Sequence, residues 1–321
     1  MKKILVCGAG GFIGSHLVRS LRAQGHYVVG ADLKFPEFSI TAANEFHQVD
    51  LRNQRSVRRL ITADFDEIYQ LAADMGGAAF IFSGNDDADI MHNSAIINLN
   101  ILHEMTFKKI PRIFYSSSAC MYPEYNQLDP ANPVMSEASA YPAAPDSEYG
   151  WEKLFSERLY KSFERNYGIQ VRIARLHNVF GTDSTWCGGR EKAPAALCRK
   201  VGEVEPSGTV EVWGPGTQTR SFLYINECVE GIHRLMASDY SDPVNIGSAR
   251  MISINDLVLL ISKLANKSVC IRNIDGPRGV MGRTSDNTLI QQVLGWQPPD
   301  NLELGLKELY NWIELQRHGQ T

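Results

Sequence analysis

The stretch "ILVCGAGGFIGSHLV", residues 4–18, decides the fold. An apolar run leads into Gly8, Gly11 and Gly14, and an amphipathic helix is predicted to begin near Ser15. Glycines at this spacing allow a tight turn and let the backbone approach a pyrophosphate, whose charge the amino end of the helix stabilises. The stretch therefore predicts a dinucleotide-binding strand, turn and helix, with a purely structural turn as the alternative.

Two acidic residues end the next strand-like segments. Asp32 closes "HYVVGAD", where a carboxylate would accept a hydrogen bond from a ribose hydroxyl and repel a 2′-phosphate, which favours NAD over NADP. Asp50 closes "FHQVD" and would either meet the adenine or cap the helix expected to begin near Gln54. Leu71, the first residue of "LAA", is expected to run beside the cofactor.

Strand-like and helical segments alternate through the first half of the chain. The strand-like segments are "KKILVCGAG", "HYVVGAD", "FHQVDL", "FDEIYQLAA", "PRIFYSSSA" and "VRIARLHNVFG". This alternation predicts an α/β fold, a Rossmann-type doubly wound parallel sheet over residues 1–180, with a segment near 222–248 returning to it. Glycine- and proline-containing loops with shorter helices follow, which predicts a smaller C-terminal substrate-binding domain, mainly residues 181–321.

Composition limits the class of protein. The 321 residues are 44% hydrophobic, enough for a large core, and the net charge is −4, so no broad basic surface is available for nucleic acid. The six cysteines contain no CxxC pair and no metal-like spacing with histidine, so we expect free thiols and no metal site.

The first residues faintly imitate a signal peptide. Two lysines precede an apolar run, but glycines interrupt that run and no small-residue cleavage site follows. No apolar stretch is long enough to span a membrane. We therefore expect a cytoplasmic enzyme that acts on a small molecule, without a nucleic-acid or membrane partner.

The segment "YGWEK" places Tyr149 and Lys153 four residues apart, on one face of an expected helix. A phenol is a poor base at neutral pH, but a nearby ammonium and a nicotinamide cation both favour the phenolate. Hydride transfer from an alcohol needs such a base, and Ser118 on the preceding strand could stand beside it. The alternatives are an ordinary exposed pair on a helix and a strand-end serine that satisfies backbone groups.

Cys120 follows three serines in "YSSSACMYPEY", residues 115–125. The preceding residues predict a buried strand, and Pro123 should stop regular pairing. Cys120 would therefore lie at the carboxyl end of a strand, where parallel α/β sheets hold their ligands. The alternative is a small apolar side chain that fills a strand end.

Together, "GAGGFIG", Asp32, "SSSA" and "YGWEK" resemble the extended short-chain dehydrogenase/reductase family, whose members act on nucleotide sugars. Further motifs, including "LAADMGG", "SSSACMYPE", "GGREKAPAALCRK", "WGPGTQTRSF" and "GRTSDN", resemble the members that epimerise a GDP-hexose at carbons 3 and 5. The similarity covers nearly the whole chain. It implies NAD as cofactor, a GDP-sugar as substrate and a homodimer.

The resemblance also implies a mechanism. Tyr149 and NAD would oxidise the hydroxyl on carbon 4, and the resulting ketone would acidify the hydrogens on carbons 3 and 5. Cys120 and Lys192 would form the acid/base pair that moves protons on and off these carbons. For Lys192, a solvated side chain or a phosphate ligand is the alternative.

The resemblance assigns the remaining site residues. The cofactor-binding residues are Gly8, Gly11, Phe12, Ile13, Gly14, Asp32, Asp50, Leu71, Tyr149 and Lys153. The substrate-binding residues are Gly77, Ser118, Cys120, Asn178, Glu191, Lys192, Ala193, Lys200, Gln218, Arg220 and Arg283. Arg220 and Arg283 would contact the diphosphate, because the planar guanidinium suits phosphate. His177 is expected to be a packed strand-end residue rather than an acid.

Two other functions stay open. One is a related GDP-sugar epimerase, acting on a heptose or octose or at carbon 4 alone; the segment "FIFSGNDDADIMHN", residues 80–93, is a plausible place for altered specificity. The other is an NAD-sensing binding protein without catalysis. The intact Tyr149 and Lys153 count against a sensor, which needs no base.

Overall fold

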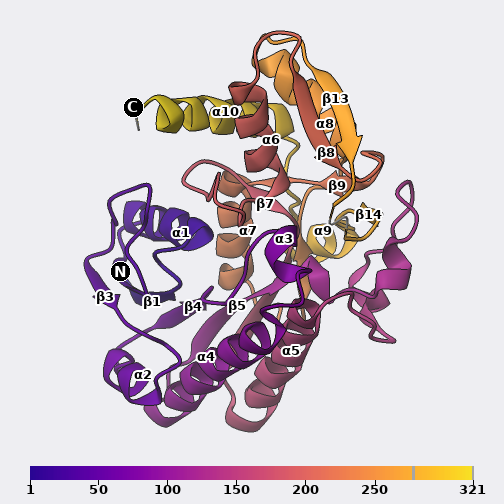
Figure 1. Ribbon diagram of the computed structural model, residues 1–321. Helices are drawn as coiled ribbons and strands as arrows, with labels where there is room; N and C mark the ends of the chain where they lie inside the picture. The colour runs from indigo at the N-terminus through magenta and orange to yellow at the C-terminus, as the bar shows by residue number, and fades with distance from the viewer. Residues whose placement is uncertain (277–278, 320–321) are drawn as a thin grey trace.

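A computed structural model describes residues 1–276 and 279–319 of the protein (Figure 1). Its centre is a seven-stranded sheet in the order β11-β6-β5-β4-β1-β2-β3, with every neighbouring pair parallel. The strands are β1 (Lys3–Cys7), β2 (Tyr27–Asp32), β3 (Glu45–Gln48), β4 (Glu67–Gln70), β5 (Arg112–Ser118), β6 (Gln170–Leu176) and β11 (Val244–Ile246). The prediction of a doubly wound parallel sheet is confirmed.

Helices cover both faces of this sheet. One face packs against α1 (Phe12–Ala23) and α7 (Ile225–Ala237), and the other against α2 (Gln54–Leu60), α4 (Asp87–Lys108) and α5 (Glu148–Tyr167). In β1, Ile4 and Val6 enter the first of these two cores, while Leu5 and Cys7 enter the second. Because both faces are buried, the strand is a continuous apolar run instead of an alternating one.

A smaller lobe occupies the upper part of Figure 1. It contains α6 (Ala193–Glu203), α8 (Ile254–Leu264), α10 (Leu302–Gly319), the parallel pair β8 (Thr209–Trp213) and β13 (Cys270–Ile274), and β9 (Thr219–Ser221) between β12 (Met251–Ser253) and β14 (Gly282–Arg283). The remaining elements are α3 (Ala78–Ile81), η1 (Ala119–Met121), η2 (Glu124–Gln127), η3 (Glu137–Ala140), β7 (Val179–Phe180), β10 (Leu223–Tyr224) and α9 (Thr288–Leu294). Residues 277, 278, 320 and 321 of the expected second domain lie outside the described residues.

The strand order reverses between β1 and β4. From β1 the sheet continues through β2 and β3 on one side and through β4, β5, β6 and β11 on the other. The crossovers at this point leave in opposite directions, which opens a crevice beyond the carboxyl ends of the strands. The topology therefore fixes where a ligand can enter.

Helix α1 begins earlier than the sequence predicts. The expected start lies near Ser15, but the helix starts at Phe12. Gly11, in an extended conformation, is the N-cap residue, and its carbonyl accepts a hydrogen bond of 2.9 Å from the amide of Ser15. The last glycine of the motif, Gly14, is consequently part of the first helical turn.

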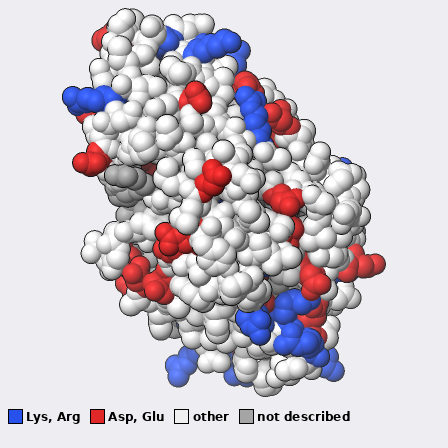
Figure 2. Space-filling model, turned by 90° about the vertical axis from the view of Figure 1, so that its right-hand side faces the viewer, with Lys and Arg blue, Asp and Glu red and all other residues white. Residues whose placement is uncertain are grey.

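The surface carries mixed charge. Figure 2 shows lysine and arginine side chains towards the two ends of the visible face, with acidic side chains scattered between them. This face has no continuous basic surface of the kind that follows nucleic acid. None of the helices within residues 1–276 and 279–319 is both long enough and apolar enough to cross a membrane.

Candidate active site

A cavity of about 800 Å³ lies at the carboxyl ends of the sheet strands, between the two lobes. All residues that the sequence singles out for cofactor, substrate or catalysis line it: Gly8, Gly11, Phe12, Ile13, Gly14, Asp32, Asp50, Leu71, Gly77, Ser118, Cys120, Tyr149, Lys153, Asn178, Glu191, Lys192, Ala193, Lys200, Gln218, Arg220 and Arg283. The fold thus brings together residues that are up to 275 positions apart, from Gly8 to Arg283.

The glycine loop forms one end of the cavity. Gly8 has a φ of +84°, and a Cβ atom there would lie 2.8 Å from the amide nitrogen of Ala72. A Cβ on Gly14 would lie 2.0 Å from the carbonyl oxygen of Gly8. Both positions therefore require glycine. The loop leads directly into the amino end of α1, which fits the pyrophosphate of a dinucleotide.

Asp32 lies beside this loop. Its carboxylate accepts hydrogen bonds from the amide of Gly10, at 2.9 Å, and from the amide of Lys34, at 3.3 Å. Burial raises the pKa of Asp32, while the backbone hydrogen bonds act in the opposite direction. The side chain is fixed at the end of β2, facing the cavity where a ribose would lie.

Asp50 does not cap α2. The N-cap residue is Asn53, whose side chain accepts a hydrogen bond of 3.1 Å from the amide of Ser56. Asp50 instead pairs with Arg52 through Nε and Nη2, each at 2.9 Å, and this pairing lowers the pKa of Asp50. The capping alternative is therefore wrong, because Asn53 directly precedes the helix.

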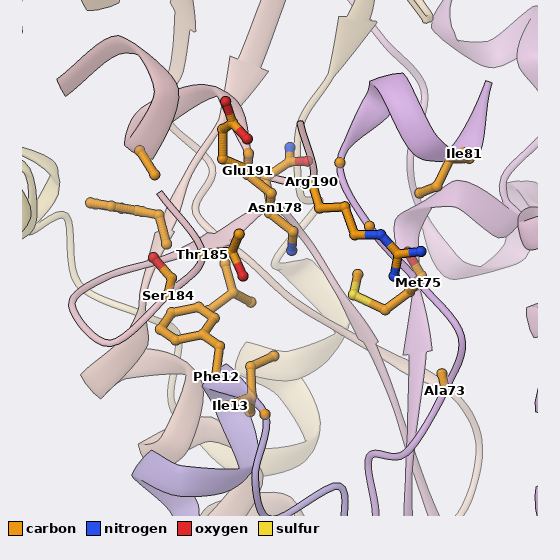
Figure 3. Close-up of a pocket in the computed structure, with 18 of the residues that line it drawn as sticks. Phe12, Ile13, Ala73, Met75, Ile81, Asn178, Ser184, Thr185, Arg190 and Glu191 are labelled. Carbon is orange, nitrogen blue, oxygen red and sulfur yellow. The ribbon is translucent and has the colours of Figure 1, made fainter. Parts of the chain in front are cut away.

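Apolar side chains line the cofactor end of the cavity. In Figure 3, Phe12 and Ile13 extend from the start of α1, and Ala73 and Met75 follow the end of β4 on another side of the cavity. Leu71 lies at the base of that second segment, where its amide donates a hydrogen bond of 3.0 Å to the carbonyl of Cys7. This contact holds the segment beside the glycine loop.

Tyr149 and Lys153 lie on the buried face of α5, so the alternative of an exposed pair is wrong. Their relative exposures are 6% and 3%. Nζ of Lys153 donates a hydrogen bond of 3.0 Å to the carbonyl of Ser116. The phenol of Tyr149 interacts with the hydroxyl of Ser118, and burial, followed by the charge of Cys120, raises its pKa. Burial is the largest effect on the pKa of this phenol, and the influence of the Lys153 ammonium on it stays a prediction.

Cys120 lies in the single turn η1, just beyond the end of β5. The side chain of Ser118 caps this turn by accepting a hydrogen bond of 3.2 Å from the amide of Cys120. Nη1 of Arg283 lies 3.1 Å from Sγ of Cys120 and donates to it. The thiol is only partly buried and faces the cavity, so it is not a core side chain that merely fills a strand end.

Lys192 is the N-cap residue of α6 and faces the same cavity. Burial lowers the pKa of its ammonium, and the negative charge of a Cys120 thiolate would raise it. In the described part of the chain, its Nζ atom has no hydrogen-bond or ion-pair partner. An amine in this setting is free to reach a ligand.

The loop before α6 closes one wall of the cavity. In this loop, the carbonyl of Arg190 accepts a hydrogen bond of 3.1 Å from the amide of Gly77. The guanidinium of Arg190 lies 4.1 Å from the centroid of the Phe80 ring. A Cβ on Gly77 would lie 2.5 Å from the carbonyl of Glu191, so the close approach requires glycine. Figure 3 shows Arg190 and Glu191 in this wall, with Asn178 near its base.

The other expected substrate residues belong to the smaller lobe or its border. Asn178 donates to the carbonyl of Ser221 at 2.9 Å, and Glu191 pairs with Arg199 at 3.2 Å. Ala193 starts α6.

Three further side chains surround the end of the cavity near β8 and β9. Lys200 donates to the carbonyl of Glu211 at 2.7 Å, and burial lowers its pKa. Gln218 donates to the carbonyl of Trp213 at 2.8 Å, while its buried Oε1 atom has no hydrogen-bond partner among the described residues. Arg220 donates to the carbonyl of Val280 at 2.6 Å, and burial, followed by the charge of Arg283, lowers its pKa to about 9.

Sequence reasoning missed the contacts that hold Arg283. Its Nε atom donates a hydrogen bond of 2.6 Å to Oε1 of Gln127, and Nη2 lies 3.7 Å from Oδ2 of Asp146. Neither residue belongs to a motif, and no local pattern pairs Gln127 with a residue 156 positions away. His177, by contrast, is fully buried and lies 3.0 Å from Oδ1 of Asn245, so the prediction of a packed histidine is confirmed.

All six cysteines are free, as predicted. Within the described residues, no group of three or more histidine, cysteine, aspartate or glutamate side chains is arranged to hold a metal ion.

The model of the NAD-dependent epimerase/dehydratase family matches residues 4–247, which include the glycine loop, Cys120, Tyr149 and Lys192. The chain belongs to the NAD-dependent epimerase/dehydratase family. The resemblance to the extended short-chain dehydrogenases/reductases is thereby confirmed, and NAD is the cofactor of the family. The glycine loop fits that cofactor, since two of its positions exclude any side chain.

One relative and two solved structures show which individual proteins the chain is similar to. GDP-mannose 3,5-epimerase of Arabidopsis thaliana is 46% identical over 316 residues, which are 98% of this chain and 82% of the relative. UDP-glucose 4-epimerase of Thermotoga maritima, solved with UDP-glucose, has the same fold, with a TM-score of 0.84, 23% identity and coverage of 98% and 99% of the two chains. UDP-glucuronic acid 4-epimerase of Bacillus cereus, solved with UDP-glucuronic acid and NAD, gives a TM-score of 0.82 at 26% identity, covering 98% and 99%.

Proposed function

We propose that the protein is an NAD-dependent GDP-mannose 3,5-epimerase. The observation that carries this proposal is the presence of Cys120 and Lys192 in one cavity with Tyr149, in a chain 46% identical to GDP-mannose 3,5-epimerase of Arabidopsis thaliana. A redox base alone would serve inversion at carbon 4. Two further proton-carrying groups are what inversion at carbons 3 and 5 requires.

The first step oxidises the hydroxyl on carbon 4. The hydroxyl of Ser118 orients the carbon 4 hydroxyl, and Tyr149 accepts the proton of that hydroxyl. Proton transfer to a positioned side chain accelerates such a step by about 10²–10⁴-fold. Bound NAD supplies the hydride acceptor and a positive charge that favours the phenolate. Lys153 supports the base from the next turn of α5, with its ammonium fixed on the carbonyl of Ser116.

The second step exchanges protons at the neighbouring carbons. A ketone at carbon 4 makes the hydrogens on carbons 3 and 5 acidic, because each carbanion is delocalised as an enolate. Cys120 and Lys192 remove and return these protons from opposite faces of the ring. Burial lowers the pKa of Lys192 towards neutral pH, which supports this role because a proton carrier must both give up and take back a proton. Return of the hydride to carbon 4 completes the reaction.

The two lobes divide the binding of the two ligands. We assign the cofactor to residues 1–180 with the returning segment near 222–248, and the GDP-sugar mainly to the rest of 181–321. The substrate residues of the second lobe include Lys200, Gln218 and Arg220, whose polar atoms suit a nucleoside diphosphate. Local positive charge is needed there because the whole chain has a net charge of −4.

One observation keeps a different GDP-sugar as the second candidate. Ile81 and Phe82, from the segment that sequence analysis singles out for altered specificity, line the cavity. Apolar side chains at this position would select among sugars by shape. The chemistry at carbons 3 and 5 would be unchanged.

We also propose a cytoplasmic homodimer. The outer faces of α4 and α5 expose apolar side chains, Leu99 on α4 and Trp151 and Phe155 on α5. Burial of such a face against a second copy removes apolar area from water.

Proton NMR in heavy water tests the proposal. The protein is incubated with GDP-mannose, and the signals at carbons 3, 4 and 5 are followed. Loss of the signals at carbons 3 and 5 supports the 3,5-epimerase. Inversion at carbon 4 without deuterium supports the 4-epimerase, because the hydride leaves and returns through NAD. No change with NAD bound would contradict both.

A further inference from the structure

The loop of residues 187–191 leads into Lys192 and α6. Gly188 and Gly189 in this loop have φ values of +89° and +88°, a conformation that glycine adopts without strain. In the described part of the chain, no atom outside the neighbouring residues lies within 4 Å of where a Cβ atom would stand on either glycine. Packing around these glycines therefore does not hold the loop, and contacts of the other loop residues must set the position of Lys192.

Arg199 on α6 holds the loop on the side of the smaller lobe. Its Nε atom donates a hydrogen bond of 3.2 Å to the carbonyl of Trp186, and its Nη2 atom donates one of 3.2 Å to Oε1 of Glu191. The other carboxylate oxygen of Glu191 accepts a hydrogen bond of 2.6 Å from the amide of Gly189. These contacts fix both ends of the loop to α6.

Arg190 connects the same loop to the segment that follows β4 in the larger lobe. Its carbonyl accepts the hydrogen bond of 3.1 Å from the amide of Gly77, and its guanidinium carbon lies 4.1 Å from the centroid of the Phe80 ring. A cation at this distance is attracted to the electron-rich face of an aromatic ring. Figure 3 shows the side chain of Arg190 extending away from the wall with Glu191 towards Met75 on the facing segment.

The Phe80 ring belongs to the apolar cluster that contains the redox base. The buried members of this cluster and the two partly buried residues packed against it are Phe80, Ile81, Ile90 and Tyr149, with Phe82 and Cys120. Arg190 therefore attaches the wall that carries Lys192 to the cluster that contains Tyr149 and Cys120. One contact between distant segments joins the three groups that the reaction uses.

We propose that Arg190 is a positioning residue, whose contact with Phe80 holds Lys192 at a fixed place relative to Tyr149 and Cys120. The inference rests on the proposed function, in which Lys192 moves a proton at one of the ring carbons. Arg190 itself neither gives nor takes a proton. A displacement of about 1 Å can cost on the order of 10²-fold in rate, so a loosened loop should slow the step that uses Lys192 and spare the oxidation at carbon 4.

Limited digestion with trypsin tests the contact without any nucleotide sugar. Trypsin cuts after Arg190 and after Lys192, and the loop must leave the cavity wall before either bond can enter the protease. The Phe80→Leu variant keeps both cleavage sites but lacks the aromatic face. Mass spectrometry of the NAD-loaded protein should show cleavage in the loop roughly two- to fivefold faster than in the parent, because a contact between a cation and an aromatic ring is lost.

Two comparisons make this digestion specific. Cleavage at the other lysines and arginines in the same sample should keep the parent rate, which separates opening of the loop from general unfolding. Phe82→Leu is the matched control, because it removes a ring two residues away that faces Gly279 instead, and it should leave cleavage of the loop unchanged. Arg190→Gln should speed cleavage after Lys192 by a similar factor and provides a second test if Phe80→Leu does not fold.

The two steps of the reaction separate positioning from general damage. In Arg190→Gln, transient formation of NADH from GDP-mannose should stay within about twofold of the parent, while deuterium incorporation at the carbon served by Lys192 should fall roughly tenfold. Lys192→Ala identifies that carbon. Arg190→Lys should recover part of the rate, since an ammonium is also attracted to the ring. The control Arg234→Gln removes a contact of 5.3 Å with the Trp296 ring, outside the cavity, and should keep all rates.

Unchanged cleavage of the loop in both Phe80→Leu and Arg190→Gln, or faster cleavage at all sites alike, would overturn the inference. Equal slowing of NADH formation and of exchange at both carbons would also overturn it. Weaker binding of GDP to Arg190→Gln in calorimetry would do the same, because Arg190 would then be a phosphate ligand. If cleavage changes as expected but the parent does not convert GDP-mannose, the contact between Arg190 and Phe80 stands and the proposed function fails.

Discussion

Nζ of Lys153 lies 5.5 Å from the centroid of the Tyr149 ring, one turn further along α5. The ammonium does not act on the phenol alone, since it also donates to the carbonyl of Ser116. Burial lowers the pKa of Lys153 and raises that of Tyr149. The pair is therefore arranged for a base that becomes effective when a second positive charge, the nicotinamide of NAD, lies beside it.

Removing the phenol tests this base. The Tyr149→Phe variant should lose about 10²–10⁴-fold in the rate of conversion of GDP-mannose, because it lacks the group that takes the proton from the hydroxyl on carbon 4. Binding of NAD should be retained, since the ring remains in place. Tyr167→Phe, on the exposed end of the same helix, is the control and should have the parent rate. Comparable rates for Tyr149→Phe and the parent would contradict the assignment.

Removing the proton carriers should separate redox chemistry from exchange. In Cys120→Ala and in Lys192→Ala, transient formation of NADH from GDP-mannose should persist, because Tyr149 is intact. Deuterium incorporation at carbons 3 and 5 should fall by about 10²–10⁴-fold at one or both positions. Stopped-flow absorbance and NMR measure the two steps. The control is Cys187→Ala, an exposed thiol in the loop that leads to Lys192. Exchange at the parent rate in either main variant would remove that residue from the mechanism.

The charge of Asp32 should set cofactor choice. Asp32→Asn keeps an oxygen that can accept from the amide of Gly10 but removes the negative charge that would repel a 2′-phosphate. The ratio of NADP to NAD affinity should rise roughly tenfold, which corresponds to about 1.4 kcal/mol. Calorimetry on cofactor-free protein measures it. Asp50→Asn should not alter the ratio, since Asp50 is expected near the adenine. No change in Asp32→Asn would place the ribose elsewhere.

Glu227 on α7 should make stability depend on pH. Burial raises its pKa from 4.5 to about 7, and its Oε1 atom has no hydrogen-bond partner in the described structure. The folded protein holds this proton more tightly than the unfolded chain, so the contribution to stability is complete below pH 4.5 and is lost as the pH rises through about 7.

The Glu227→Gln variant isolates this contribution. It should melt at least roughly 2 °C higher than the parent at pH 8 and show little difference near pH 4.5. Glu230→Gln, which alters an exposed ion pair on the same helix, is the control and should show no such pH-dependent difference. If the melting temperatures of the parent and the Glu227→Gln variant differ by the same amount at both pH values, the raised pKa of Glu227 does not contribute to stability as described. Thermal denaturation followed by circular dichroism provides the measurement.

Local patterns in the sequence predict much of this fold. The six quoted strand segments of the first half all contain sheet strands. Five of these strands are mostly buried, as expected for short apolar runs in a parallel sheet, whereas β3 is a largely exposed edge strand. The spacing of Tyr149 and Lys153 correctly predicts a shared helical face. Helix boundaries are less certain: α1 starts at Phe12 rather than near Ser15, since Gly14 is tolerated in the first turn.

Contacts between distant segments could not be predicted in this way. Asp50 is a plausible cap by position, but Asn53 takes that role because it stands immediately before α2. The hydrogen bond between Gln127 and Arg283 joins η2 to β14, and it depends on how the two lobes pack. No helical or strand period extends across such a separation, so only the tertiary structure reveals which groups surround Cys120.

A structure of the protein with NAD and GDP-mannose tests the central claim most directly. Our account predicts that Sγ of Cys120 and Nζ of Lys192 lie on opposite faces of the hexose, each within reach of carbon 3 or carbon 5. Both groups on the same face, or either one too far from the ring to transfer a proton, would contradict it.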